Sequence, residues 1–141
     1  MLRSDPLQQL ALLEDGSLDL SYEALQKSAY DQYMARWLQV FRREQIHVID
    51  GDQLIINPLP ELVKIETFLG LRHRITKKNL YYDKKKGFYC VAKSKGSDGC
   101  LGQGKGHKHP DIAPKLRQQL HQYFAPLNQK FFEQIQQTFS W

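Results

Sequence analysis

A glycine-rich basic segment runs from Gly102 to Pro110, with the sequence Gly-Gln-Gly-Lys-Gly-His-Lys-His-Pro. Glycines allow backbone N–H groups to approach an anion closely, and the interleaved Lys and His side chains add positive charge. Phosphate or sulfate is therefore the ligand that this composition favours. The spacing does not match a Walker loop, because no Gly-Lys-Ser/Thr follows a strand. As a pattern alone, the segment is equally typical of a flexible connector.

The two cysteines, Cys90 and Cys100, allow two interpretations. A disulfide between them would close a small ring and stabilise the fold by about 2–3 kcal/mol in the chain-entropy treatment. Alternatively, both thiolates could join His107 and His109 as zinc ligands. Common zinc modules place paired ligands roughly two to four residues apart, and this segment does not match them.

Groups for acid–base or nucleophilic catalysis do not form a recognisable arrangement. The sequence holds no Ser/His/Asp set and no carboxylate pair at a familiar spacing. Asp50 and Asp52 are expected to form a turn and contact solvent. Residue chemistry alone thus predicts an anion-binding part of an α/β protein and identifies no catalytic residue.

Positive charge is concentrated in a basic tract, residues 72–108, which holds eleven Lys and Arg residues, two Asp residues and a net charge of +9. The rest of the chain carries −4, within a total of +5. A local potential of this sign attracts polyanions such as nucleic acid, phosphorylated nucleotides or sulfated polysaccharide. A merely solvated basic loop is the alternative.

The elements that must position these groups begin with a helix. Apolar side chains at spacings of three and four predict an amphipathic helix from Ser21 to Phe41. The β-branched run Ile46–Ile49 then predicts a buried strand of a parallel sheet. Asn57, directly before a proline, predicts the start of a second helix that ends at Gly70. The order helix, strand, helix is typical of α/β proteins.

From Leu71 to Pro110 the apolar periodicity fails, which predicts a long segment without regular elements. Helical periodicity returns at residues 114–124, and Pro126 is expected to end that helix. Another helix is expected from Phe131 to Trp141. The predicted organisation is one partial domain: a helix-strand-helix segment at 14–71, a basic segment at 72–110 and C-terminal helices at 111–141.

The chain has 141 residues, 41% of them hydrophobic and 25% charged, which fits one globular domain or a large piece of one. Its apolar runs are far shorter than the roughly 20 residues that span a bilayer. Acidic residues at Asp5, Glu14 and Asp15 make a poor secretory signal. We therefore expect no membrane segment and no targeting segment in these residues.

Several motifs, in conserved order along the chain, resemble the C-terminal half of the heparan sulfate glucosamine 3-O-sulfotransferases. They are His47-Val48-Ile49-Asp50-Gly51-Asp52, Lys84-Lys85-Lys86-Gly87-Phe88-Tyr89-Cys90, Ser94-Lys95-Gly96, Cys100-Leu101, Lys105-Gly106-His107-Lys108-His109-Pro110, and the end from Phe131-Phe132 to Thr138-Phe139-Ser140-Trp141. The resemblance runs from about Glu14 to Trp141. Tyr89 directly before a cysteine is more similar to the type 1 and type 5 enzymes.

The resemblance implies the C-terminal portion of a P-loop-like α/β sulfotransferase fold, with helices around a partial parallel sheet and a disulfide-closed basic loop. Members of that family transfer a sulfuryl group from 3′-phosphoadenylyl sulfate (PAPS) to the 3-hydroxyl of a glucosamine in heparan sulfate, inside the Golgi lumen. The implied partners are heparan sulfate or heparin and PAPS or its product PAP, with neither a metal nor nucleic acid.

The same resemblance assigns roles to individual residues. Contacts to PAPS are implied for Tyr89, Lys105, Gly106, His107, Lys108 and His109. Lys84 and Lys86 match lysines expected to bind heparan sulfate, and Cys90 and Cys100 match the disulfide of the family. Gly99 stands where the type 1 enzyme has a basic residue, so a glycan contact is not implied there.

The first half of the family carries a Lys-Gly-Gly-Thr-Arg loop for the 5′ end of PAPS and a glutamate base, and neither is among these 141 residues. The resemblance therefore implies a partial gene model, a truncated isoform or a fragment that is inactive alone. The alternative is a non-enzymatic polyanion-binding module, for sulfated glycan or nucleic acid, because aromatic and basic residues interleave from Arg72 to Tyr89.

Overall fold

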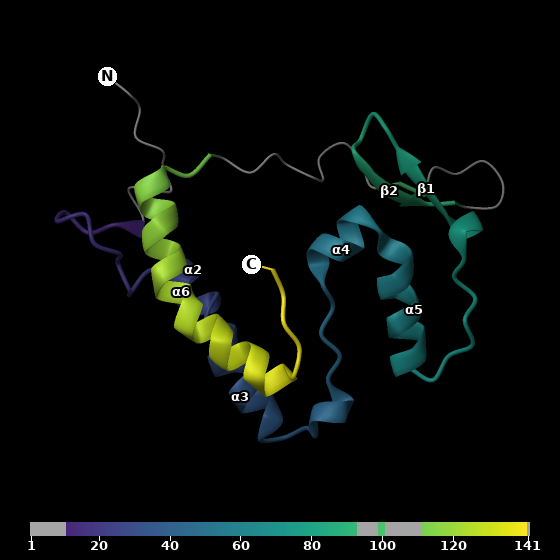
Figure 1. Cartoon of the computed structure of the whole chain (residues 1–141), viewed down its shortest axis with the longest axis horizontal. Coiled ribbons are helices and arrows are strands. Elements are labelled where there is room, and N and C mark those ends of the chain that lie inside the picture. The colour runs from purple at the N-terminus through teal and green to yellow at the C-terminus, as the bar shows by residue number, and fades with distance from the viewer. Residues whose placement is uncertain (1–10, 93–98, 101–110, 141) are drawn as a thin grey trace. The chain divides into compact units, whose positions relative to one another are not determined.

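The computed structural model describes residues 11–92, 99–100 and 111–140. These residues form mainly helices, together with one two-stranded sheet (Figure 1). The chain divides into two compact units, residues 1–46 with 110–141 and residues 47–109. Across the described ranges, no helix combines the length and apolarity that crossing a membrane requires.

The helix expected from Ser21 to Phe41 is interrupted, so its predicted continuity is wrong. α2 spans Glu23–Lys27 and α3 spans Tyr30–Leu38. Between them, the Ser28 hydroxyl donates a hydrogen bond of 2.8 Å to the carbonyl four residues earlier, a contact that often bends helices. Ala29 leaves helical geometry with ψ at 76° and is buried. Packing of this small residue thus overrides the helical periodicity.

α6 is one continuous helix over Pro114–Ile135, with Pro126 inside it. The predicted end at Pro126 and the separate helix from Phe131 to Trp141 are therefore wrong. An interior proline costs about 3 kcal/mol because it removes a backbone hydrogen bond and clashes with the preceding turn. Here Pro126 is exposed, where water can bond the carbonyl that lost its donor, and burial of Phe131 and Ile135 offsets the cost. The helix ends at Ile135 and is followed by Gln136, which caps it with a left-handed φ of 54°.

α3 and α6 lie side by side in the first unit (Figure 1). Tyr30 of α3 packs against Phe131 of α6, with ring centroids 5.7 Å apart. Beyond α3, the Arg43 Nε donates a hydrogen bond of 3.0 Å to the Ile135 carbonyl, where the end of α6 has no intrahelical donor. Ring packing and this cap together hold the C-terminal half of α6.

Residues 46–49, for which the sequence predicts a strand, lie at the boundary between the two units and form neither a helix nor a strand. A strand requires a neighbour that shares its backbone hydrogen bonds, and among the described residues no strand pairs with this segment. The predicted strand is therefore wrong, and the described residues form no parallel sheet. The α/β class itself is confirmed by helices that accompany a small sheet.

α4, which the sequence analysis does not predict, and α5 follow. Asp50 and Asp52 start α4 where the sequence predicts only a turn, so that prediction is wrong. The Asp50 carboxylate accepts a hydrogen bond of 3.0 Å from the Gln53 backbone N–H, which starts α4 at Gly51–Ile56. α5 spans Pro58–Phe68 and is followed by Gly70 with a φ of 66°. The helix predicted between Asn57 and Gly70 is thus confirmed.

A β-hairpin occupies part of the segment for which the sequence predicts no regular elements, and that prediction is wrong. The short 3-10 helix η2 (Lys77–Asn79) leads into β1 (Leu80–Asp83), which pairs antiparallel with β2 (Phe88–Val91). In the turn, the Asp83 carboxylate accepts hydrogen bonds from the backbone N–H groups of Lys85 and Lys86, at 2.9 and 3.1 Å. Gly87 closes the turn with a φ of 76°.

Candidate functional site

A tyrosine-lined cavity of about 460 Å³ lies between the hairpin and the start of α5. Its lining comprises Asn57, Pro58, Leu59, Lys77, Leu80, Tyr81, Tyr82 and Tyr89. Tyr82 and Tyr89 face each other across the two strands, with ring centroids 5.2 Å apart and an edge-on angle of 71°. Aromatic faces can stack on a planar base, and the Lys77 ammonium and Asn57 amide can bond polar groups of the same ligand.

The hairpin turn carries the lysines that the sequence analysis assigns to glycan binding. Lys84 and Lys85 are exposed, and Lys86 is half-buried. Within the described residues, neither Lys84 nor Lys85 forms an ion pair. Because Asp83 bonds backbone N–H groups of the turn, its carboxylate fixes the loop that presents these ammonium groups. The turn thus presents positively charged side chains on a loop held by hydrogen bonds, an arrangement that can bind an anionic polymer.

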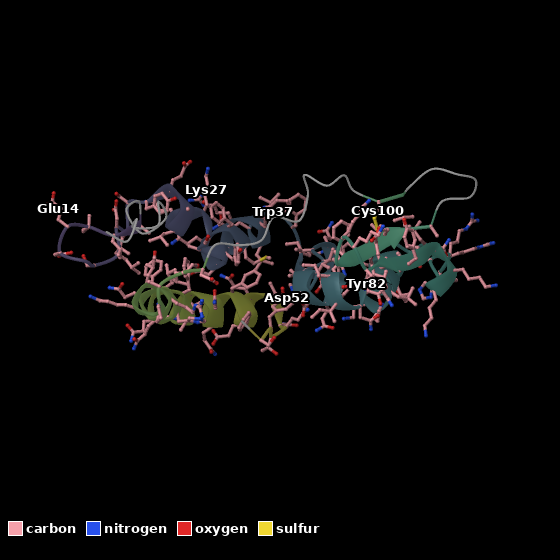
Figure 2. The ribbon with its side chains drawn as sticks, turned by 90° about the horizontal axis from the view of Figure 1, so that it is seen from above. Glu14, Lys27, Trp37, Asp52, Tyr82 and Cys100 are labelled. Carbon is pink, nitrogen blue, oxygen red and sulfur yellow. A yellow bond between two sulfur atoms is a disulfide. The ribbon has the colours of Figure 1, made fainter. Side chains whose placement is uncertain are left out.

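Cys90 and Cys100 form a disulfide with a Cα–Cα distance of 4.7 Å, which Figure 2 shows at Cys100. The predicted pairing is confirmed, and Cys90 is almost fully buried at 2% exposed. The Asp83 carboxylate lies within 4.8 Å of both sulfur atoms. Sulfur atoms joined to each other are not the thiolates that zinc binds, and His107 and His109 lie outside the described residues. The structure therefore favours the disulfide over the zinc interpretation.

The structure brings together only part of the predicted site. Tyr89, Lys84, Lys86, Cys90 and Cys100 all belong to the hairpin and its disulfide. The other predicted PAPS contacts, Lys105, Gly106, His107, Lys108 and His109, lie outside the described residues.

Sequence reasoning missed Tyr82, Lys77 and Asn57 as neighbours of Tyr89. The run Leu-Tyr-Tyr-Asp facing Gly-Phe-Tyr-Cys across a glycine-containing turn is a hairpin pattern, and it could have placed Tyr82 opposite Tyr89. Asn57 comes from the start of α5, so no local pattern links it to the hairpin.

In the described part of the first unit, the carboxyls of Asp15 and Asp19 have clearly shifted pKa values. Hydrogen bonds from the Ser17 hydroxyl, and then from its backbone N–H, lower the pKa of Asp15. The Ser21 hydroxyl and backbone N–H lower the pKa of Asp19 in the same way. These bonds shape local turns.

The hairpin and helices define an α/β protein that presents a cationic turn beside an aromatic cavity. A model of the sulfotransferase domain matches residues 15–139, nearly the whole sequence. The chain belongs to the sulfotransferase domain family.

Within this family, the chain is similar to heparan sulfate 3-O-sulfotransferases. The chain is 41% identical over 124 residues to human heparan sulfate glucosamine 3-O-sulfotransferase 5, covering 88% of the chain and 36% of that protein. It is 37% identical over 128 residues to the mouse 3-O-sulfotransferase 3B1, covering 89% of the chain and 33% of the relative. The chain thus spans about a third of the length of the relatives it matches, and its resemblance to heparan sulfate 3-O-sulfotransferases is confirmed.

Proposed function

We propose that these residues form the part of a heparan sulfate 3-O-sulfotransferase that binds PAPS and the glycan. The observation that carries the proposal is the juxtaposition, on one hairpin, of a tyrosine-lined cavity with a lysine-bearing turn. A planar base attached to phosphates and a sulfated polysaccharide are the two acidic ligands of such a reaction. Because both ligands are acidic, both would bind residues of the basic tract.

The side chains that line the cavity match the two parts of the nucleotide, its planar base and its phosphates. Tyr89 and Tyr82 offer aromatic surface for the base, and Lys77 offers a positive charge for a phosphate. In the proposed reaction, the glucosamine 3-hydroxyl oxygen would bond to the sulfur of PAPS as the sulfur–oxygen bond to phosphate breaks and PAP leaves. The hydroxyl proton would pass to the base that the resemblance attributes to residues outside this sequence. Lys84 and Lys86 would hold the glycan by its sulfate and carboxylate groups. These roles, and those of Lys105, Gly106, His107, Lys108 and His109, rest on the resemblance and the residue chemistry.

The compartment proposed for the protein is the Golgi lumen. Heparan sulfate modification takes place there in the family, and the Cys90–Cys100 disulfide suits an oxidising compartment.

Calorimetric titration of the whole 141-residue chain with PAP tests the nucleotide site. We expect Tyr89→Ala to weaken PAP binding about tenfold, because it removes a stacking surface. Tyr33→Ala, which removes an exposed tyrosine of α3, is the matched control and should bind as the wild type. Equal PAP affinity in all three proteins would contradict the assignment of Tyr89.

A non-enzymatic polyanion-binding module is the second candidate, favoured by the exposed Lys84 and Lys85 that lack ion-pair partners among the described residues. Retention on heparin without any affinity for PAP would support the module. Affinity for both ligands supports the sulfotransferase assignment.

A further inference from the structure

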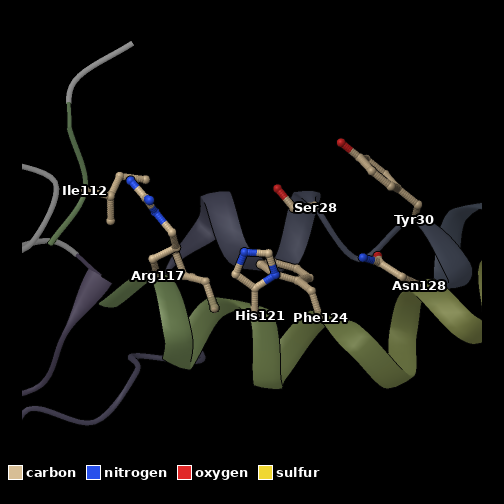
Figure 3. A pocket seen from close by; sticks show the side chains of 8 residues that line it. Ser28, Tyr30, Ile112, Arg117, His121, Phe124 and Asn128 are labelled. Atoms are coloured by element: carbon tan, nitrogen blue, oxygen red, sulfur yellow. The ribbon is translucent and has the colours of Figure 1, made fainter. Parts of the chain in front are cut away.

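A second cavity, of about 310 Å³, lies in the unit formed by α2, α3 and α6, and uses no residue of the hairpin (Figure 3). Its lining comprises Ser28, Tyr30, Ile112, Arg117, Leu120, His121, Phe124 and Asn128. This volume is at the lower end of the range for small-molecule sites, roughly 300–1,000 Å³.

The lining separates into an apolar wall and a polar rim. Leu120 and Phe124 lie one turn apart on α6 and are half-buried, and Ile112 adds apolar surface from the segment before the helix. Arg117 and His121 lie four residues apart, so their side chains occupy the same face of α6, as Figure 3 shows.

Two polar groups of the rim, the side chains of Arg117 and His121, have no partner among the described residues, whereas the Ser28 hydroxyl bonds a backbone carbonyl. Within the described ranges, the Arg117 guanidinium and the His121 ring form no hydrogen bond and no ion pair. Arg117 and His121 are both exposed at the rim of the cavity. An arginine without a carboxylate partner can bind an anion there, because its planar fork can bond both oxygens of a carboxylate. His121 can donate a further hydrogen bond to the same group.

We propose that this cavity binds a small amphipathic carboxylate, with the apolar part against Leu120 and Phe124 and the carboxylate at Arg117 and His121. The site is independent of the proposed sulfotransferase function, because it shares no lining residue with the tyrosine-lined cavity of the hairpin. An uncharged ligand of the same shape would contact Leu120 and Phe124 but would form no charged hydrogen bond with the Arg117 guanidinium.

Titration of the whole 141-residue chain with decanoate, monitored by NMR and calorimetry, tests the site. We expect saturable binding with shifts of the His121 ring signals and not of those of His47 or His73. Arg117→Gln should weaken decanoate binding about tenfold, because a charged hydrogen bond is lost. Lys115→Gln removes the same charge from the same helix outside the cavity, and should bind as the wild type.

Decanol is the matched uncharged ligand, and it should bind at least tenfold more weakly than decanoate. Leu120→Trp, which fills the apolar wall, should abolish binding of both ligands while circular dichroism shows that the helices remain. Equal affinity of decanoate and decanol, equal loss in Arg117→Gln and Lys115→Gln, or shifts confined to other histidines would overturn the proposal. Absence of saturable decanoate binding to the wild type would overturn it as well.

Discussion

Asp83 is the residue on which the geometry of the cationic turn depends. Its carboxylate accepts two backbone hydrogen bonds, from Lys85 and Lys86, so it sits among lysines as an acceptor and orders the loop that presents them. The ammonium groups of Lys84 and Lys85 extend into solvent, where a polyanion can reach them. One acidic residue in a basic tract therefore has a positioning role.

The pKa of the Asp15 carboxyl depends on hydrogen bonds from one residue, Ser17. Its hydroxyl and backbone N–H bond the charged form of Asp15, which lowers the pKa of Asp15 below the ordinary value of 3.8. The stabilisation is therefore complete above the ordinary pKa and is lost as the pH falls through the lowered one. Ser17→Ala should raise the pKa of Asp15 in an NMR titration.

Asp19 is the internal control for that titration, because its bonds come from Ser21. Its pKa should not change in Ser17→Ala. Equal shifts of both carboxyls, or no shift of Asp15, would contradict this cause.

At the scale of elements, the hairpin turn is set by a backbone conformation that glycine alone adopts without strain. Gly87 has a φ of 76°, and a Cβ added there would meet nothing within 4 Å. We expect Gly87→Ala to lower the free energy of unfolding of the chain by about 1 kcal/mol, since only the backbone is strained. Urea denaturation measures this loss.

Gly51→Ala is the matched substitution, at the first residue of α4. A Cβ there also meets nothing within 4 Å, and the position has no left-handed φ. Its free energy of unfolding should stay the same or rise slightly, because alanine favours helix. Equal destabilisation by both changes would show that the turn conformation is not the cause.

Helices whose ends are marked by capping residues or proline in the adjacent sequence could be predicted. Helices whose length depends on buried contacts with distant residues could not. Asn57, Pro58 and Gly70 mark α5 because capping and proline chemistry act on adjacent residues. Pro126 misled the prediction, because buried contacts of Phe131 and Ile135 offset the lost hydrogen bond.

The same division holds for the candidate site. Tyr89, Lys84 and Lys86 could be found from a family motif within one segment. Asn57 and Lys77 could not, because they come from different elements that only the fold brings to one cavity.

For the whole molecule, we expect these 141 residues alone to transfer no sulfate. The resemblance attributes the proton-accepting carboxylate and the 5′ phosphosulfate loop to residues that this sequence does not contain, and loss of such groups lowers rates by orders of magnitude. Incubation of the purified chain with radiolabelled PAPS and heparan sulfate measures the transfer. Incorporation above a control without protein would refute this expectation.

Charge is distributed unevenly over the molecule, with +9 in the basic tract and −4 elsewhere. A sulfated glycan should therefore bind the tract, and salt should weaken the interaction because exposed charges are screened.

Elution from immobilised heparin in a NaCl gradient tests most directly whether this tract binds the glycan. The double variant Lys84→Ala/Lys86→Ala should elute at a clearly lower salt concentration than the wild type. Lys115→Ala/Lys130→Ala, which loses the same charge from α6, should elute close to the wild type. The same elution salt for all three proteins, or an equal decrease in both variants, would contradict the assignment of the glycan to the hairpin turn.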